Sequence, residues 1–161
     1  MAAKGKSGPG AGLELVPAEP GFLKDMLESR HLSGFLRAAA EQTLTHQAET
    51  GAPAPWTGYF ARQGSEWVGI CAFVDRPSGG EVEIAYGTAP GFEGSGIATA
   101  MALWLVERAF QEAEVTAVVA NTAPEPNAST RILETLGFRR DGVIQDAGIG
   151  EAWHWRKPRG Y

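Results

Sequence analysis

A strand, a glycine-rich turn and a helix start follow one another near the middle of this 161-residue chain. Glu81–Ala89 has alternating apolar side chains, which predicts a strand. Gly94–Gly96 then leads into residues 98–113, which contain no Gly or Pro and predict a helix. A helix start exposes unpaired N–H groups at the positive end of a dipole, and small residues let an anion approach them. The segment therefore predicts a phosphate-binding loop, with a purely steric turn as the alternative.

Two other phosphate-binding motifs are weighed against the same segment. A Walker-type loop is excluded in its usual form, because no Gly-Lys-Ser/Thr follows. A dinucleotide site is a closer rival, with Thr99 in place of the third Gly and Glu114 near the position of a ribose-binding acid. However, that fingerprint normally opens a parallel sheet of several βαβ units. Here it comes past the middle of the chain, after strands that look antiparallel.

A second informative segment spans residues 121–142. Either Asn127 or Ser129 can cap a helix whose following residues include an apolar side. Gly137 stands where a left-handed residue commonly ends a helix, and Phe138 begins a further strand. The segment therefore predicts a short capped helix between two strands.

The two segments, in this order and at this separation, resemble the glycine loop and the Asn-x-Ser…Leu-Gly-Phe segment of GNAT-family N-acetyltransferases. The closer likeness is to the branch that contains the ribosomal-protein N-terminal acetyltransferases, and it runs from about Trp67 to Trp155. Two departures stand out. Glu93 occupies the place where the family loop usually begins with Arg or Gln, and Pro126 holds the usual Asn place, so that Asn127 is displaced by one.

The resemblance implies an α+β fold with a mixed sheet, the GNAT acyl-CoA N-acyltransferase fold. The pattern of the chain agrees with it in the order β-α-α-β-β-β-α-β-α-β-β. We expect residues 1–12 to be a disordered tail, partly a cloning remnant, and residues 13–158 to be a single domain. The expected elements are strand 13–17, a helix from 20, helix 32–48, strands 56–62, 66–74 and 81–89, helix 98–113, strand 115–121, the capped helix, and strands 138–145 and 151–156.

Composition narrows the classes of partner. The net charge of −5 disfavours a nucleic-acid groove and favours cationic substrates such as amines. The single cysteine, Cys71, lies in an apolar strand-like run and is interpreted as a buried small hydrophobe rather than a nucleophile. The three histidines have no ligand-like spacing, so no metal site is expected, and no long apolar span suggests a membrane. A cytoplasmic enzyme, as a monomer or a homodimer, is the expected setting.

The resemblance also implies how acetyl-CoA binds as a co-substrate. Its pantetheine arm would pair with the strand around Tyr86, and its pyrophosphate would lie on the glycine loop. Gly87 is consistent with a bulge or a close backbone approach. The residues expected to bind acetyl-CoA are Tyr86, Gly87, Thr88, Gly94, Ser95, Gly96, Ile97, Ala98, Asn127 and Arg131.

The reaction that the family implies is direct attack of an amine on the acetyl thioester. Glu83 is the candidate base, with a solvated strand residue as the alternative. Ser129 is the candidate proton donor to the departing sulfur, with a helix cap as the alternative; Tyr86 is a weaker donor candidate. Trp153 and Trp155 are expected to cover the sheet, although one of them could wall the acceptor pocket.

The acceptor itself has no readable motif. The family implies a pocket made by the first two helices, the loop around residues 29–34 and the final hairpin. The candidates are a peptide N-terminal amine, a polyamine, an aminoglycoside-like drug and an amino acid. Two alternatives to an enzyme remain open: a catalytically weak acetyl-CoA-binding module that regulates a partner, and a dinucleotide-binding protein.

Overall fold

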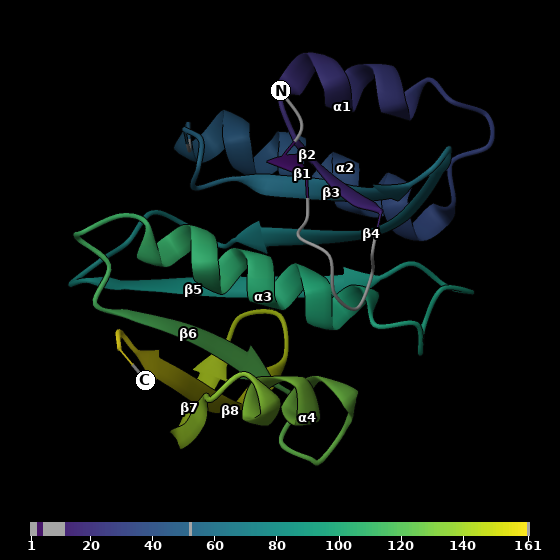
Figure 1. Cartoon of the computed structure of the whole chain (residues 1–161). Helices are drawn as coiled ribbons and strands as arrows, with labels where there is room; N and C mark the ends of the chain where they lie inside the picture. The colour runs from purple at the N-terminus through teal and green to yellow at the C-terminus, as the bar shows by residue number, and fades with distance from the viewer. Residues whose placement is uncertain (1–2, 5–11, 52, 161) are drawn as a thin grey trace.

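A mixed sheet runs through the described residues, 3–4, 12–51 and 53–160, in a computed structural model of the chain (Figure 1). Its eight strands lie in the order β1-β2-β3-β4-β5-β6-β8-β7. Among these strands β5 and β6 form a parallel pair, and every other neighbouring pair is antiparallel. The strands are β1 Ala3–Lys4, β2 Leu13–Pro17, β3 Gly58–Gln63, β4 Glu66–Phe73, β5 Glu81–Thr88, β6 Ala117–Thr122, β7 Arg139–Asp146 and β8 Gly150–Pro158.

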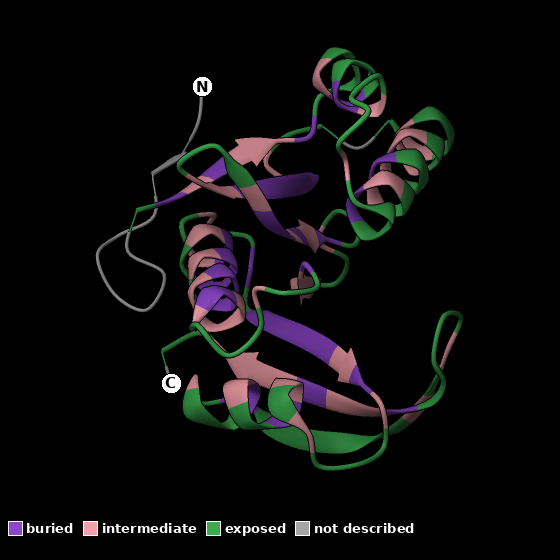
Figure 2. Ribbon diagram, turned by 90° about the vertical axis from the view of Figure 1, so that its right-hand side faces the viewer, coloured by how far each residue is buried: buried purple, intermediate pink, exposed green. Residues whose placement is uncertain are grey.

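Helices cover both faces of the sheet, as the turned view shows (Figure 2). The helices are α1 Pro20–Leu27, α2 Gly34–Thr50, α3 Ile97–Phe110 and α4 Ala128–Thr135. On one face, α3 and α4 pack on the larger core, where Val82 and Ile84 of β5 meet Met101 and Leu105 of α3. On the other face, α1 and α2 enclose a second core around Phe60. Alternation along β5 therefore divides its side chains between two different environments.

The predicted order of elements is confirmed, and most bounds agree within a few residues. Strand 13–17 is found as expected. Gly137 has a φ of 91° directly after α4, as predicted for its left-handed position. The structure adds β1, which pairs with β2 inside the segment expected to be a disordered tail. That expectation was wrong for Ala3–Lys4; residues 1–2 and 5–11 lie outside the described residues.

The sheet topology argues against the dinucleotide alternative. A dinucleotide fold needs several adjacent parallel strands, whereas the described strands contain the single parallel pair β5–β6. Glu114 is also misplaced for a ribose-binding acid. It follows the C-terminal end of α3, and its carbonyl oxygen lies near Gly80, which immediately precedes β5. The glycine loop, residues 94–96, stands at the opposite end of both elements.

The parallel pair separates partway along its length, and this separation prepares the site. β5 and β6 pair only from Glu81–Ala117 to Glu83–Val119. Beyond this point β5 remains paired with β4 as far as Thr88, while β6 diverges from it (Figure 1). On its β6 side, residues 84–88 of β5 therefore present backbone groups that no strand of the described sheet uses.

Candidate functional site

The glycine loop joins the open end of β5 to the start of α3. Gly94 and Gly96 have φ angles of 77° and 83°, a conformation that glycine adopts without strain. Gly96 is the N-cap of α3, and its carbonyl oxygen accepts the first helical hydrogen bond, from Ala100. The N–H groups of the three residues before Ala100 begin the helix without intrahelical acceptors. They form the expected positive end of a 14-residue helix.

Glu93 turns its carboxylate back into its own loop. Its Oε1 accepts hydrogen bonds from the backbone N–H groups of Gly91 at 2.6 Å and Phe92 at 3.2 Å. The Ser95 hydroxyl donates to the Phe92 carbonyl oxygen at 2.7 Å. The two side chains thus lock the turn ahead of α3. These loop N–H groups stabilise the negative charge of Glu93. The residue also lines the cleft between β5, the glycine loop and α4.

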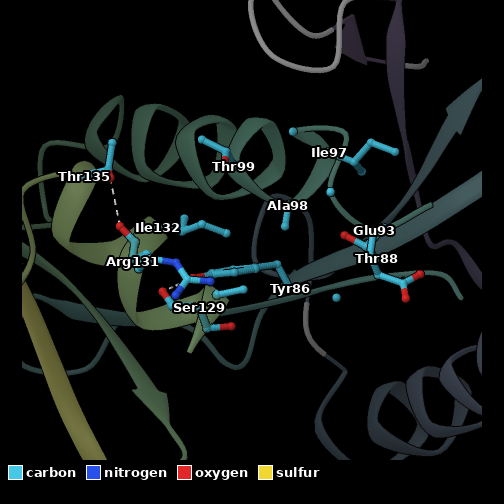
Figure 3. A pocket seen from close by; sticks show the side chains of 14 residues that line it. Tyr86, Thr88, Glu93, Ile97, Ala98, Thr99, Ser129, Arg131, Ile132 and Thr135 are labelled. Atoms are coloured by element: carbon cyan, nitrogen blue, oxygen red, sulfur yellow. Dashed lines mark hydrogen bonds between the residues drawn. The ribbon is translucent and has the colours of Figure 1, made fainter. Parts of the chain in front are cut away.

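A cleft of about 480 Å³ lies between the open end of β5, the glycine loop and α4 (Figure 3). It brings together eight of the ten residues predicted to bind the cofactor. Ser95 and Asn127 are not part of its lining, because the first locks the turn and the second caps α4. The lining comprises Tyr86, Gly87, Thr88, Glu93, Gly94, Gly96, Ile97, Ala98, Thr99, Ala128, Ser129, Arg131, Ile132 and Thr135.

The start of α4 gives Asn127 and Ser129 different roles. Asn127 is the N-cap, and its side chain accepts a hydrogen bond from the Thr130 N–H at 3.0 Å. In return the Asn127 N–H donates to the Thr130 hydroxyl at 2.9 Å, which completes a capping box. Ser129 is therefore not needed for the cap, and it lines the cleft instead. Of the two predicted capping residues, Asn127 is the one that caps.

Tyr86 reaches from β5 across the cleft toward α4 (Figure 3). Its hydroxyl donates to the backbone carbonyl oxygen of Ser129 at 3.5 Å. Burial raises the pKa of Tyr86 to about 12, so the hydroxyl is protonated at neutral pH. The Arg131 side chain also lines this cleft and brings a positive charge to it (Figure 3).

A second groove, of about 490 Å³, lies on the other side of β5, against α2. Most of its lining is apolar, from Phe35 and Ala39 on α2 to Ile70 and Ala85 on the sheet. Tyr86 and Gly87 line both this groove and the 480 Å³ cleft. The two cavities therefore adjoin at one point of β5.

Gly87 makes a close approach possible at this point. A Cβ atom on Gly87 would lie 3.2 Å from Cζ of Phe35, so the α2 side chain packs directly on the strand backbone. The sequence allowed either a close approach or a bulge here. The pairing of β4 with β5 continues without a shift from Phe73–Ile84 to Gly69–Thr88, so a close approach is the correct interpretation.

Glu83 lies at the last position where β5 pairs with β6, on the strand face opposite Val82 and Ile84. Asn121 Nδ2 approaches its carboxylate at 3.4 Å. Burial raises the pKa of Glu83 above the ordinary value, and the negative charge of Asp146 raises it further. Glu83 is thus a half-buried carboxylate rather than a fully solvated strand residue, and it is a stronger base than a free glutamate.

Three polar residues beside Glu83 were not predicted from the sequence: Asn121, Asp146 and His154. Asn121 Nδ2 donates to Asp146 Oδ2 at 3.1 Å, and Asn121 Oδ1 lies 2.7 Å from His154 Nδ1. The alternation of side chains along β8 could have pointed to His154, because a strand residue between Trp153 and Trp155 must face away from both. Trp155 is buried in the α3 core and donates to the Thr122 hydroxyl at 2.9 Å, so this tryptophan covers the sheet and His154 faces the side opposite α3.

Cys71 is poorly placed to act as a nucleophile. Its side chain is fully buried, and burial raises the pKa of its thiol.

Within residues 3–4, 12–51 and 53–160, no cluster of three or more His, Cys, Asp or Glu is placed to hold a metal ion. No helix in the same part of the chain has the length and apolar character needed to cross a bilayer.

Comparisons with known proteins agree with this geometry. The family model described as an acetyltransferase (GNAT) domain matches residues 25–139, more than half of the chain. A search of curated proteins gave no match.

Several solved structures share the fold at low sequence identity. An apo structure of RimL, a ribosomal L7/L12 alpha-N-protein acetyltransferase, is 15% identical, with a TM-score of 0.68 over 94% of this chain and 96% of that one. Mycobacterium smegmatis RimJ, in complex with CoA-disulfide, is 16% identical, with a TM-score of 0.66 over 91% and 82%. The aminoglycoside acetyltransferase AAC(6')-Ib, in complex with paromomycin and acetyl-CoA, is 24% identical, with a TM-score of 0.63 over 91% and 92%.

Proposed function

The chain belongs to the GNAT acetyltransferase family, and we propose that it transfers the acetyl group of acetyl-CoA to a primary amine by direct attack while both substrates are bound. The observation that carries this proposal is the junction of the two cavities at Tyr86 and Gly87. One cavity opens onto the glycine loop, and the other lies against α2. Two substrates that enter from opposite sides of β5 would meet at the open end of this strand.

The cleft has the features that acetyl-CoA needs. The backbone N–H groups at the start of α3 would hold the pyrophosphate, because an anion is stabilised at the positive end of a helix. The backbone of β5 beyond Glu83, which does not pair with β6, would hydrogen-bond the pantetheine amides. Arg131 is the cation in the lining that would contact a phosphate of the cofactor. Thr99, Ile132 and Thr135, which the sequence did not single out, would add side-chain contacts.

Two side chains would move the protons of the reaction. As the amine nitrogen bonds to the acetyl carbon, the carbon–sulfur bond breaks and the amine loses a proton. Glu83 would accept this proton through water, and its raised pKa makes it better suited to do so. Ser129 would donate a proton to the departing sulfur, because a thiol with an ordinary pKa of about 8.5 leaves poorly as an unassisted anion. Ser129 would then regain a proton from water while Glu83 releases the amine proton to water, so that both side chains return to their starting states.

The acceptor is proposed to be an α-amine or another weakly basic amine. An α-amine has a pKa of about 8, so a useful fraction is neutral near pH 7.5, whereas a lysine-like amine has a pKa of about 10.4 and is almost fully protonated. With Glu83 as the single base, an α-amine is the better acceptor, because less of it has to be deprotonated before it attacks. RimL is described as acting on an alpha amino group and AAC(6')-Ib is bound to an aminoglycoside, so the fold accommodates different amines.

The test is steady-state release of CoA thiol over a panel of amines near pH 7.5. The panel pairs short peptides that have a single α-amine with alkylamines of similar size. The proposal expects amine-dependent thiol release, with the α-amines turned over faster than the alkylamines. If acetyl-CoA binds but no amine raises thiol release above hydrolysis, the alternative of a regulatory acetyl-CoA-binding module is correct.

A further inference from the structure

Four polar side chains from four strands meet on the sheet face opposite α3. They are Glu83 of β5, Asn121 of β6, Asp146 at the end of β7 and His154 of β8. Asn121 is the member that contacts all three others. Its Nδ2 lies 3.4 Å from Glu83 Oε2 and 3.1 Å from Asp146 Oδ2, and its Oδ1 lies 2.7 Å from His154 Nδ1.

The charges around Asn121 fix the orientation of its amide. The NH₂ group has two hydrogens, one for each neighbouring carboxylate, whereas the reversed amide would place its oxygen against two negative charges. With the amide in this orientation, Oδ1 is an acceptor, so His154 Nδ1 must be the donor. A neutral His154 is therefore the tautomer with the proton on Nδ1.

We propose that Asn121 is a positioning residue that holds the Glu83 carboxylate on the strand face that it shares with Ala85, which lines the 490 Å³ groove. Asn121 also fixes the Nδ1–H tautomer of His154. The role rests on the proposed function insofar as Glu83 is the base. Without the two N–H donors of Asn121, the negative charges of the Glu83 and Asp146 carboxylates would repel one another more strongly.

The remaining contacts of Asp146 extend this arrangement to the last hairpin. Asp146 Oδ1 accepts hydrogen bonds from the N–H groups of Gly148 at 2.8 Å and Ile149 at 3.1 Å, in the turn between β7 and β8. These bonds lower the pKa of Asp146, so that it keeps its negative charge beside Glu83. Asn121 thus connects the proposed base to the turn that the family places at the acceptor pocket.

The nearest acidic neighbour of Glu83 along the same face of β5 already has a cationic partner. Glu81, two residues before Glu83, is bound by Arg156 Nε of β8 at 2.8 Å. Burial and the negative charge of Asp146 raise the pKa of Glu83. The inference adds an opposing effect of the Asn121 N–H donor, and an effect of His154 that acts through Asn121.

The decisive experiment measures the pKa of Glu83 by carboxyl ¹³C NMR in the protein without acetyl-CoA. Asn121→Leu removes the donor with little change of volume and should raise this pKa by about one unit, because a hydrogen bond to a charged group is lost. Asp146→Asn removes the neighbouring charge and should lower it. Thr122→Val is the matched control, since it removes a hydrogen bond of the same strand on the opposite face and should leave the Glu83 pKa unchanged.

A second readout covers the case in which Asn121→Leu does not fold. The ¹⁵N spectrum of the unaltered protein should show His154 with the proton on Nδ1 when the ring is neutral. Asn121→Asp should raise the pKa of Glu83, because it adds a second neighbouring carboxylate. An unchanged Glu83 pKa in every folded Asn121 variant, or a proton on Nε2 of neutral His154, would overturn the inference.

The same variants separate this inference from the proposed function. If the acid limb of the pH profile of kcat/KM moves together with the Glu83 pKa, the results support both the positioning role of Asn121 and the role of Glu83 as the base. If the NMR pKa moves and the activity profile does not, Asn121 positions Glu83 as inferred, but Glu83 is not the base.

Discussion

The Tyr86 hydroxyl donates a hydrogen bond to the backbone carbonyl oxygen of Ser129 at 3.5 Å, across the open end between β5 and α4. The bond joins a strand residue to a helix residue 43 positions later in the chain. It places the first turn of α4 beside the part of β5 where the two cavities meet. The fold therefore holds Ser129, the candidate proton donor, close to β5, the strand proposed to bind the pantetheine arm.

Ser129→Ala should lower kcat about ten- to a hundredfold, because a proton donor to the departing sulfur is lost. Acetyl-CoA affinity and melting temperature should change little, since Asn127 and Thr130 make the helix cap. Thr130→Val is the complementary control. It should cost about 1 kcal/mol of stability through the cap while most of kcat remains. Full turnover by Ser129→Ala would remove Ser129 from the chemistry.

Gly96→Glu should abolish the rise in melting temperature that acetyl-CoA produces, because the side chain adds bulk and negative charge at the start of α3. The rise in the unaltered protein corresponds to about 2.7 kcal/mol at a ligand concentration of 100 Kd. Gly51→Glu is the control for backbone strain, because Gly51 also has a positive φ, of 61°, and ends α2 instead. Both variants should lose stability, but only Gly51→Glu should keep the response to acetyl-CoA.

Glu93→Gln should strengthen acetyl-CoA binding about three- to tenfold by removing a negative charge from the wall of the proposed pyrophosphate site. Gln can still accept the hydrogen bonds from Gly91 and Phe92, so the turn is kept. Titration calorimetry at two salt concentrations would measure the gain, which should shrink as salt increases. Acetyl-pantetheine, which has no pyrophosphate, should show no such gain; an equal gain with both ligands would place the effect elsewhere.

Glu83→Gln should make the protein more stable at neutral pH but not at pH 4. The pKa of Glu83 is raised in the fold, so the folded state disfavours its charged form. Its contribution to stability is therefore present below the unfolded pKa of about 4.3 and is lost as the pH rises through the folded value. Denaturant unfolding measured from pH 4 to pH 7 should show that the free energy of unfolding of the variant rises relative to that of the unaltered protein as the pH increases. Glu81→Gln, on the same strand face but ion-paired with Arg156, should not gain.

Local patterns of the sequence were enough to predict the glycine loop, the capped helix and the order of the elements. These features depend on turn residues and side-chain periodicity within a short segment. Gly137 adopts the positive φ angle that its place after the end of α4 favours. The Glu93 contacts also belong to one turn, but their direction, back toward Gly91, could not be read from residue types alone.

The polar cluster and the junction of the two cavities could not be predicted in this way. Asn121 meets Glu83 because β6 pairs with β5, and it meets His154 because β8 pairs with β6. Those pairings are set by the packing of the whole sheet and not by any segment of the chain. The close approach of Phe35 to Gly87 likewise depends on where α2 crosses the strand.

The most direct test of the account is the initial-rate pattern with acetyl-CoA and the best amine of the panel both varied. Direct attack in a complex that holds both substrates predicts intersecting reciprocal plots, with the N-acetylated amine and free CoA formed in equal amounts. Protein incubated with acetyl-CoA alone should carry no acetyl group by intact-mass measurement. Parallel plots together with an acetylated protein would contradict the account, because they would show that the chain first takes the acetyl group onto one of its own side chains.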